Sequence, residues 1–142
     1  MISFILVSLS LLLLVSPALA DERILSYDSV IEVFVDGSMQ VTETIRVRAE
    51  KQEIKRGIYR DFPTDYKDRF GNHYRVDFDV VDVRRDNYEE AWHTKAITDG
   101  VRVYMGRKNV YLDSSEYTYA LTYRTNRQLG FFDNHYELSW NI

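Results

Sequence analysis

The 142-residue chain contains no cysteine. Disulfide bonds, thiolate zinc sites and cysteine nucleophiles are therefore all excluded. Attachment of lipid to an N-terminal cysteine is excluded for the same reason. The lack of disulfides says little about the cellular compartment, because a secreted domain with a sufficiently large core can be stable without them.

The sequence also lacks a stretch of predominantly basic residues. Its 18 Lys and Arg are spread among 22 Asp and Glu, which gives a formal net charge of −4. This distribution argues against nucleic acid as the main partner. No G-x-S-x-G, H-E-x-x-H, P-loop or Rossmann glycine pattern occurs, so serine-nucleophile, zinc-peptidase and nucleotide chemistry have no support. No cofactor is expected.

After residue 20 no apolar pattern has a helical period, whereas the alternation typical of strands recurs. Aromatic residues make up 14% of the chain, and with Val, Ile and Thr they form a composition favoured in sheets. We therefore predict an all-β fold, an antiparallel β-sandwich of about seven strands in one domain at residues 21–142, with an open β-barrel as the alternative. The expected strands cover residues 24–35, 38–49, 74–83, 92–98, 101–105, 116–125 and 135–141.

Turn residues define how several of these strands connect. The pairs Asp36-Gly37 and Asp99-Gly100 each separate two alternating runs, and such pairs predict tight hairpins because Gly tolerates positive φ. The apolar positions change parity at Val80-Val81, which predicts a β-bulge. Residues 50–73 are expected to form a long loop.

The N-terminus has the pattern of a secretory signal. Residues 2–15 are apolar apart from three serines, and Pro17-Ala18-Leu19-Ala20 follows. The Ala18-x-Ala20 spacing is typical of signal-peptidase sites, so residues 1–20 are predicted to be a hydrophobic signal helix that is cleaved after Ala20. No Lys or Arg precedes the apolar run, and an uncleaved membrane anchor is the alternative. In either case the remainder is expected to be extracytoplasmic, secreted or membrane-anchored at the cell envelope.

Glu43 interrupts the apolar face of the strand predicted at residues 38–49. A buried carboxylate without a partner costs about 3–5 kcal/mol, so Glu43 is expected to meet a cation. Arg56 and Arg60 are the nearest downstream candidates, and a guanidinium can donate two hydrogen bonds to one carboxylate. We expect a structural ion pair that attaches this segment to the sheet, with a ligand site as the alternative. Gly57, between the arginines, is expected to let the backbone turn or approach another strand closely.

Two further groups of residues near the C-terminus are candidates for binding. Asp133, His135 and Glu137 alternate along the last predicted strand, and together they could hold a divalent cation. The solvent-exposed face of a strand is the simpler explanation, so no metal site is expected. Phe131-Phe132, in a predicted turn, are expected either to pack against the domain or to form an exposed apolar contact with a partner or a bilayer.

Five segments occur in order over nearly all of residues 24–142: VDGSMQVTETI, RGIYRDFP, DGVRVYMG, EYTYALTYRT and ELSWN. Together they resemble the N-terminal domain of the YciQ-like predicted membrane proteins, a domain-of-unknown-function family. The resemblance implies an extracytoplasmic β-sandwich behind a signal peptide, followed in full-length members by transmembrane helices. Ser139 stands where the family usually has an aromatic residue, and the Thr-Gly…Trp segment that normally follows is missing. We therefore expect the domain to be truncated at its C-terminus.

These observations favour a non-enzymatic sensing or interaction domain of a cell-envelope membrane protein. Its expected partners are the membrane and an envelope protein or glycan. The alternative is an envelope glycan-binding module or a glycan-acting hydrolase, although no pair of carboxylates stands out for hydrolysis. An open cleft containing Glu43, Arg56 and Arg60 would favour the enzyme. A filled core in which these groups are paired, with an aromatic rim, would favour interaction, and a sugar-binding platform would need exposed rings in a row.

Overall fold

The computed structural model describes residues 21–68, 70–131, 134 and 136–138. In these residues it contains twelve strands and no helix, and hence no helix that could span a bilayer. Every strand pair is antiparallel, so the prediction of an all-β antiparallel fold is confirmed. The signal helix expected at residues 1–20 lies outside the described part of the chain.

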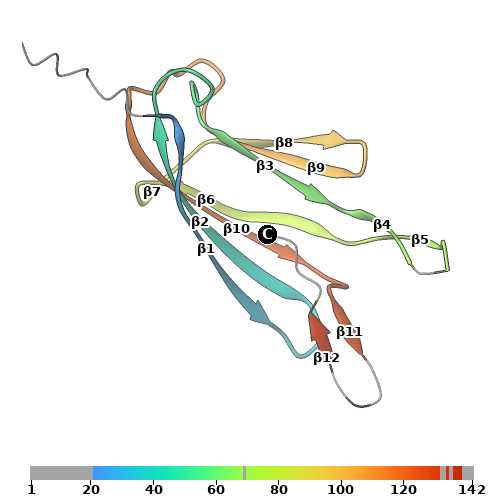
Figure 1. Cartoon of the computed structure of the whole chain (residues 1–142). Coiled ribbons are helices and arrows are strands. Elements are labelled where there is room, and N and C mark those ends of the chain that lie inside the picture. Colours follow the sequence, from blue (N-terminus) through green and yellow to red (C-terminus); the bar gives the residue numbers. More distant parts are fainter. Residues whose placement is uncertain (1–20, 69, 132–133, 135, 139–142) are drawn as a thin grey trace, which may run out of the picture.

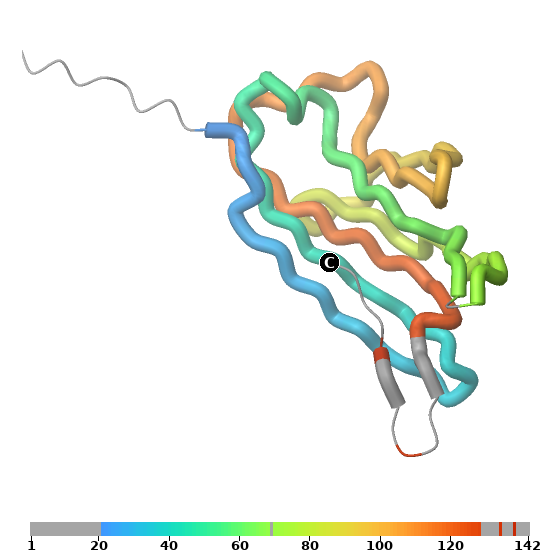
Figure 2. Tube along the Cα trace, turned by 45° about the vertical axis from the view of Figure 1, so that its right-hand side comes forward, coloured from blue at the N-terminus to red at the C-terminus, as the bar shows by residue number. Residues whose placement is uncertain are grey.

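The larger sheet contains five strands in the order β1-β2-β10-β6-β7 (Figure 1). The β1–β2 hairpin turns at Asp36-Gly37 as predicted, and Gly37 has a φ of +80°. β2 and β10 are far apart in the sequence but run side by side along their whole length (Figure 2). The strands are β1 (Arg23–Val33), β2 (Met39–Ala49), β6 (Phe78–Arg85), β7 (Tyr88–Glu89) and β10 (Ser115–Thr125).

β6 contains the predicted bulge. Its register with β10 pairs Asp82 with Thr122 and then Val80 with Tyr123, which leaves Val81 as the extra residue. A bulge of this kind bends the strand and changes which side chains face the core. The change of parity read from the sequence at Val80-Val81 is therefore confirmed.

The smaller sheet has the order β3-β9-β8 and includes the hairpin predicted at Asp99-Gly100. Its turn residues are Thr98 and Asp99, one position earlier than predicted, and Gly100 is the first residue of β9. The prediction of a loop at residues 50–73 is wrong, because this region contains two strands and the first residue of a third. Arg60 occupies an inward position of β3 and interrupts its apolar alternation, and the partner strand β9 is distant in the sequence, so no local pattern indicates this strand. The strands are β3 (Ile58–Pro63), β8 (Trp92–Ile97) and β9 (Gly100–Met105), with the separate hairpin of β4 (Asp65–Lys67) and β5 (His73–Arg75).

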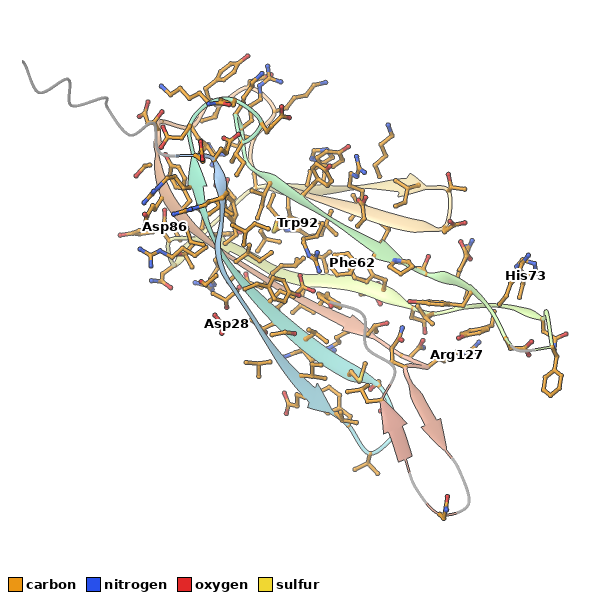
Figure 3. All side chains as sticks on the ribbon, in the orientation of Figure 1. Asp28, Phe62, His73, Asp86, Trp92 and Arg127 are labelled. Atoms are coloured by element: carbon orange, nitrogen blue, oxygen red, sulfur yellow. The ribbon has the colours of Figure 1, made fainter. Side chains whose placement is uncertain are left out.

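The two sheets face each other across one hydrophobic core and do not close into a barrel. Phe62 of β3 lies between them, as Figure 3 shows, and its ring packs against Phe78 at 4.5 Å and Tyr123 at 4.7 Å between centroids. The other buried members of this core come from β2, β6, β9 and β10: Val41, Ile45, Val47, Val83, Val103, Met105, Tyr119 and Leu121.

The C-terminal region forms a short hairpin of β11 (Leu129–Phe131) and β12 (Tyr136–Leu138). β12 lies within the strand predicted at residues 135–141, of which the structure describes residues 136–138, with the side chain of Leu138 exposed. Five strands, β3, β4, β5, β7 and β11, have no counterpart of their own among the expected ones, so the described residues hold twelve strands rather than about seven.

Candidate functional site

Glu43 lies in the middle of β2 and faces the core between the two sheets, where its side chain is only 2% exposed. Arg60, on the inner face of β3, donates from Nε to Oε2 at 2.8 Å and from Nη2 to Oε1 at 3.1 Å. Both carboxylate oxygens are thus bound by one guanidinium, the geometry in which such pairs are strongest. The pair links the larger sheet to the smaller one.

Two tyrosine hydroxyls complete the surroundings of this pair. Tyr123 on β10 donates to Oε1 of Glu43 at 3.2 Å, and Arg60 lies 3.4 Å from the hydroxyl of Tyr27 on β1. Burial, with Glu43 acting in the same direction, raises the pKa of Tyr27 to about 12 and also raises the pKa of Tyr123. The hydrogen bond to Glu43 raises the pKa of Arg60. Both phenols therefore stay protonated at neutral pH. The Tyr123 hydroxyl donates to Glu43, and the Tyr27 hydroxyl accepts from Arg60.

Arg56 does not contact Glu43. Its guanidinium lies 4.6 Å from the ring centroid of Tyr111 and donates to the Tyr111 hydroxyl, and the residue is exposed. The physical reason is that β3 begins only at Ile58, so Arg56 precedes the strand and is not part of its inner row. Of the two arginines expected near Glu43, the structure brings only Arg60 to the carboxylate.

Gly57 lies at a close approach of two backbones. It has a φ of +142°, and a Cβ atom on it would lie 1.9 Å from the carbonyl oxygen of Met105. Gly106 faces it with a φ of +134°, and a Cβ atom there would lie 2.1 Å from the carbonyl oxygen of Arg56. Any side chain at either position would push the start of β3 away from the end of β9.

A second buried acid, Glu90, lies in the connection between β7 and β8, and the sequence analysis did not identify it. Glu90 is 7% exposed, and Arg85 lies 2.6 Å from it, measured from Nε to Oε2. The other oxygen of Glu90 accepts a hydrogen bond from the backbone N–H of Ala91 at 2.9 Å. Glu90 lies in a polar stretch without alternation, so no local signal in the sequence marks it as buried.

The outer face of the smaller sheet carries a row of rings. By register, Tyr59 of β3 lies opposite Tyr104 of β9, which lies opposite His93 of β8. The Tyr59 and Tyr104 centroids are 6.0 Å apart, and the Tyr104 and His93 rings stack at 4.7 Å with an interplanar angle of 8°. Tyr59 is 55% exposed. Nothing in the sequence alone shows that these residues are neighbours.

A groove of about 660 Å³ lies beside this row, at the end of the sheet where β3 begins. Gly57 and Gly106 contribute backbone to its lining, and the rings of Tyr59, His93, Tyr104 and Tyr111 also line it. Its described lining residues include one acid, Glu53, and four bases: Lys55, Arg56, Arg107 and Lys108. We call this feature the cationic groove.

A second hollow, also of about 660 Å³, lies between β6 and β8. Its charged lining residues in the described part of the chain are Asp65, Asp77 and Asp79, with Arg75 as the base. Arg75 already pairs with Asp65 at 2.8 Å. The two hollows therefore have opposite charge, and only the cationic groove can attract an anion.

The metal and contact candidates of the C-terminal region lie outside what the structure describes. Asp133, His135 and Phe132 are not described, nor are the side chains of Phe131 and Glu137. In the residues that are described, no group of three or more His, Asp or Glu could hold a metal ion.

Comparison with known proteins gave two matches. Residues 23–142 match the family described as "Predicted membrane protein (DUF2207) N-terminal domain". The chain is 27% identical over 122 residues to "Uncharacterized protein YciQ" of Escherichia coli (strain K12), which covers 86% of this chain and 19% of that protein. The chain thus spans about a fifth of the length of this relative. No solved structure matches it.

Proposed function

Because this chain belongs to the family of DUF2207 N-terminal domains of predicted membrane proteins, we propose that it is the extracytoplasmic interaction domain of a cell-envelope membrane protein. The proposed role is non-enzymatic: the domain binds a partner or ligand outside the cytoplasmic membrane. The apolar residues 1–20, with the pattern of a secretory signal, support this location. The much greater length of the relative, of which the match covers 19%, supports further segments that anchor the family in the membrane.

The observation that carries the proposal is the closed environment of Glu43. Its carboxylate is paired with Arg60 in a filled core, so it cannot meet a substrate. A typical glycan hydrolase needs two accessible carboxylates about 5–10 Å apart. The described lining of the cationic groove contains one carboxylate, that of Glu53. Binding therefore fits the cationic groove better than hydrolysis does.

A glycan-binding module is the second candidate, and the row formed by Tyr59, Tyr104 and His93 favours it. Aromatic rings on an open sheet face are suited to packing against the apolar faces of sugars. The same row also fits a protein partner, since tyrosine is enriched at protein interfaces.

The proposed location is tested with single cysteines, because the chain has none of its own. Ser26 and Ser29 form a matched pair on β1, since Ser26 is exposed and the hydroxyl oxygen of Ser29 is buried. We expect Ser26→Cys to react with a membrane-impermeant maleimide in cells whose cytoplasmic membrane is intact. Ser29→Cys should react only after denaturation. Reaction of Ser26→Cys only after the membrane is permeabilised would refute the location.

A further inference from the structure

We propose that the cationic groove binds an acidic saccharide, a sugar chain that carries anionic groups. This inference rests on the proposed function and names the ligand class of that interaction domain. Three features of the groove carry it: open aromatic rings, cations without partners, and loops that are held in place before any ligand arrives.

Two tyrosines offer ring surface to a sugar. Tyr59 is 55% exposed and Tyr111 is 63% exposed, and both line the groove. Each ring has a guanidinium over it: Arg102 lies 4.1 Å from the Tyr59 centroid, and Arg56 lies 4.6 Å from the Tyr111 centroid. Much of each ring remains open to solvent. The C–H groups of a pyranose carry slight positive charge and pack well on the negative face of such rings.

Cations surround these rings without being neutralised. Within the described part of the chain, Lys55, Arg107 and Lys108 form no ion pair with a carboxylate, although many other basic residues do. This occurs in a chain whose net charge is −4. A carboxylate or phosphate on the sugar would supply the missing partner through charge-assisted hydrogen bonds.

The loops that carry the cations are fixed to the body of the domain. The N–H of Leu112 donates to the carbonyl oxygen of Lys55 at 2.8 Å, which ties the two loops together. Leu112 itself is 5% exposed and anchors its loop. Beneath them, Gly57 and Gly106 hold the backbones in close contact. A preformed site loses less conformational entropy when it binds, so these rings and charges can act together.

The test compares three probes on the purified full chain by titration calorimetry. Oligogalacturonate has both sugar rings and carboxylates, its methyl ester has the rings without the charge, and polyglutamate has the charge without the rings. We expect oligogalacturonate to bind at least about tenfold more tightly than either of the others. Equal binding of polyglutamate, equal binding of the methyl ester, or no binding of oligogalacturonate would each overturn the inference.

Variants locate the binding to the groove. Tyr59→Ala and Tyr111→Ala should each weaken oligogalacturonate binding by about tenfold. Tyr88 on β7 is 79% exposed and lies outside the groove, so Tyr88→Ala serves as the matched control and should leave binding unchanged. All of these positions are exposed, and thermal melts that match wild type will show that each variant is folded. Equal binding by all three variants would refute the site.

Charge reversal gives an independent test. Arg107→Glu and Lys108→Glu should abolish binding of oligogalacturonate, whereas Lys67→Glu, an exposed base on β4 outside the groove, should not. A loss of binding with Lys67→Glu as large as with Arg107→Glu would mean that only the overall charge matters, and would overturn the inference.

The labelling and the binding experiments distinguish the proposed function from this inference. If cysteine labelling shows that the domain is extracytoplasmic but the protein does not bind oligogalacturonate, the proposed function stands and this inference fails. If Ser26→Cys reacts only after the membrane is permeabilised, the proposed function is refuted, whether or not the probes bind.

Discussion

On the inner face of the three-stranded sheet, Arg60 is held against Glu43 in the core, and one residue earlier Tyr59 stands in solvent on the outer face. Adjacent residues of β3 therefore have opposite environments, because successive side chains of a strand point to opposite faces. On the inner face, the charged group of Arg60 is paired with Glu43 by two hydrogen bonds. The outer face has exposed rings, and it lies beside Lys55, Arg107 and Lys108 of the cationic groove, which form no ion pair with a carboxylate of the described residues. Comparing the two faces separates residues that stabilise the domain from residues that are free to bind.

The largest expected effect is on the inner face. Glu43→Ala leaves the guanidinium of Arg60 without its partner in the core and should lower the free energy of unfolding by about 3–5 kcal/mol. Urea unfolding of the full chain, followed by circular dichroism, measures this. Glu43→Gln keeps the shape and an acceptor, so it should cost less. An unfolding curve of Glu43→Ala that matches wild type would mean that the inner pair does not stabilise the domain.

A smaller effect is expected just before the start of β3, where its backbone approaches the end of β9. Gly57→Ala places a Cβ atom 1.9 Å from the carbonyl oxygen of Met105, at a φ of +142°. The strands must move apart, and we expect a loss of about 1–3 kcal/mol together with weaker binding in the groove. Gly71→Ala is the matched control, since its φ of +84° is also positive but no atom lies within 4 Å of the added Cβ. If both variants lose the same free energy of unfolding, the close approach of Gly57 to Met105 does not contribute to the loss.

The smallest effect is expected on the outer face, where Asp61 accepts two hydrogen bonds from Arg102. These hydrogen bonds lower the pKa of Asp61 below its usual value of 3.8. A lowered carboxyl pKa stabilises the folded state above the unfolded-state pKa, and the stabilisation is lost as the pH falls through the folded-state pKa. Asp61→Asn should therefore lower stability slightly at neutral pH, and the difference from wild type should disappear in acid.

Thermal melts of wild type and Asp61→Asn between about pH 2 and pH 7 measure this difference. High salt should also reduce it, because exposed charges are screened. A difference that grows as the pH falls would contradict the assigned direction of the pKa shift. A loss as large as that of Glu43→Ala would remove the contrast between the two faces.

Some of the site could be predicted because its signal is local. Glu43 interrupts an otherwise apolar alternation, so its burial and its need for a cation follow from β2 alone. The sequence left two candidates, Arg56 and Arg60, for the partner of Glu43. Only the structure identifies Arg60, because β3 starts at Ile58 and Arg56 precedes it. Glu90 has no such signal, because the residues around it are polar and its burial depends on Arg85 and on the chain crossing to β8.

The cationic groove could not be predicted, because its parts come from separate segments. Tyr59 and Tyr104 are neighbours only because β3 pairs with β9, and His93 joins them only because β8 pairs with β9 on its other side. The bases come from two loops joined by a single backbone hydrogen bond between Leu112 and Lys55. No pattern within any one of these segments distinguishes a groove from an ordinary polar surface.

The sequence by itself determined six of the longer strands (β1, β2, β6, β8, β9 and β10), two hairpins, the bulge at Val81 and the burial of one acid. These features depend on the alternation of side chains and on which residues tolerate positive φ, both of which are properties of neighbours along the chain. Only the tertiary structure decided how strands distant in the sequence lie side by side. It thereby decided that Tyr123, among the eleven tyrosines, donates to Glu43, and that Tyr59 and Tyr111 are exposed in the groove. That choice rests on contacts between distant segments, whose energies appear only when both sheets pack around the shared core.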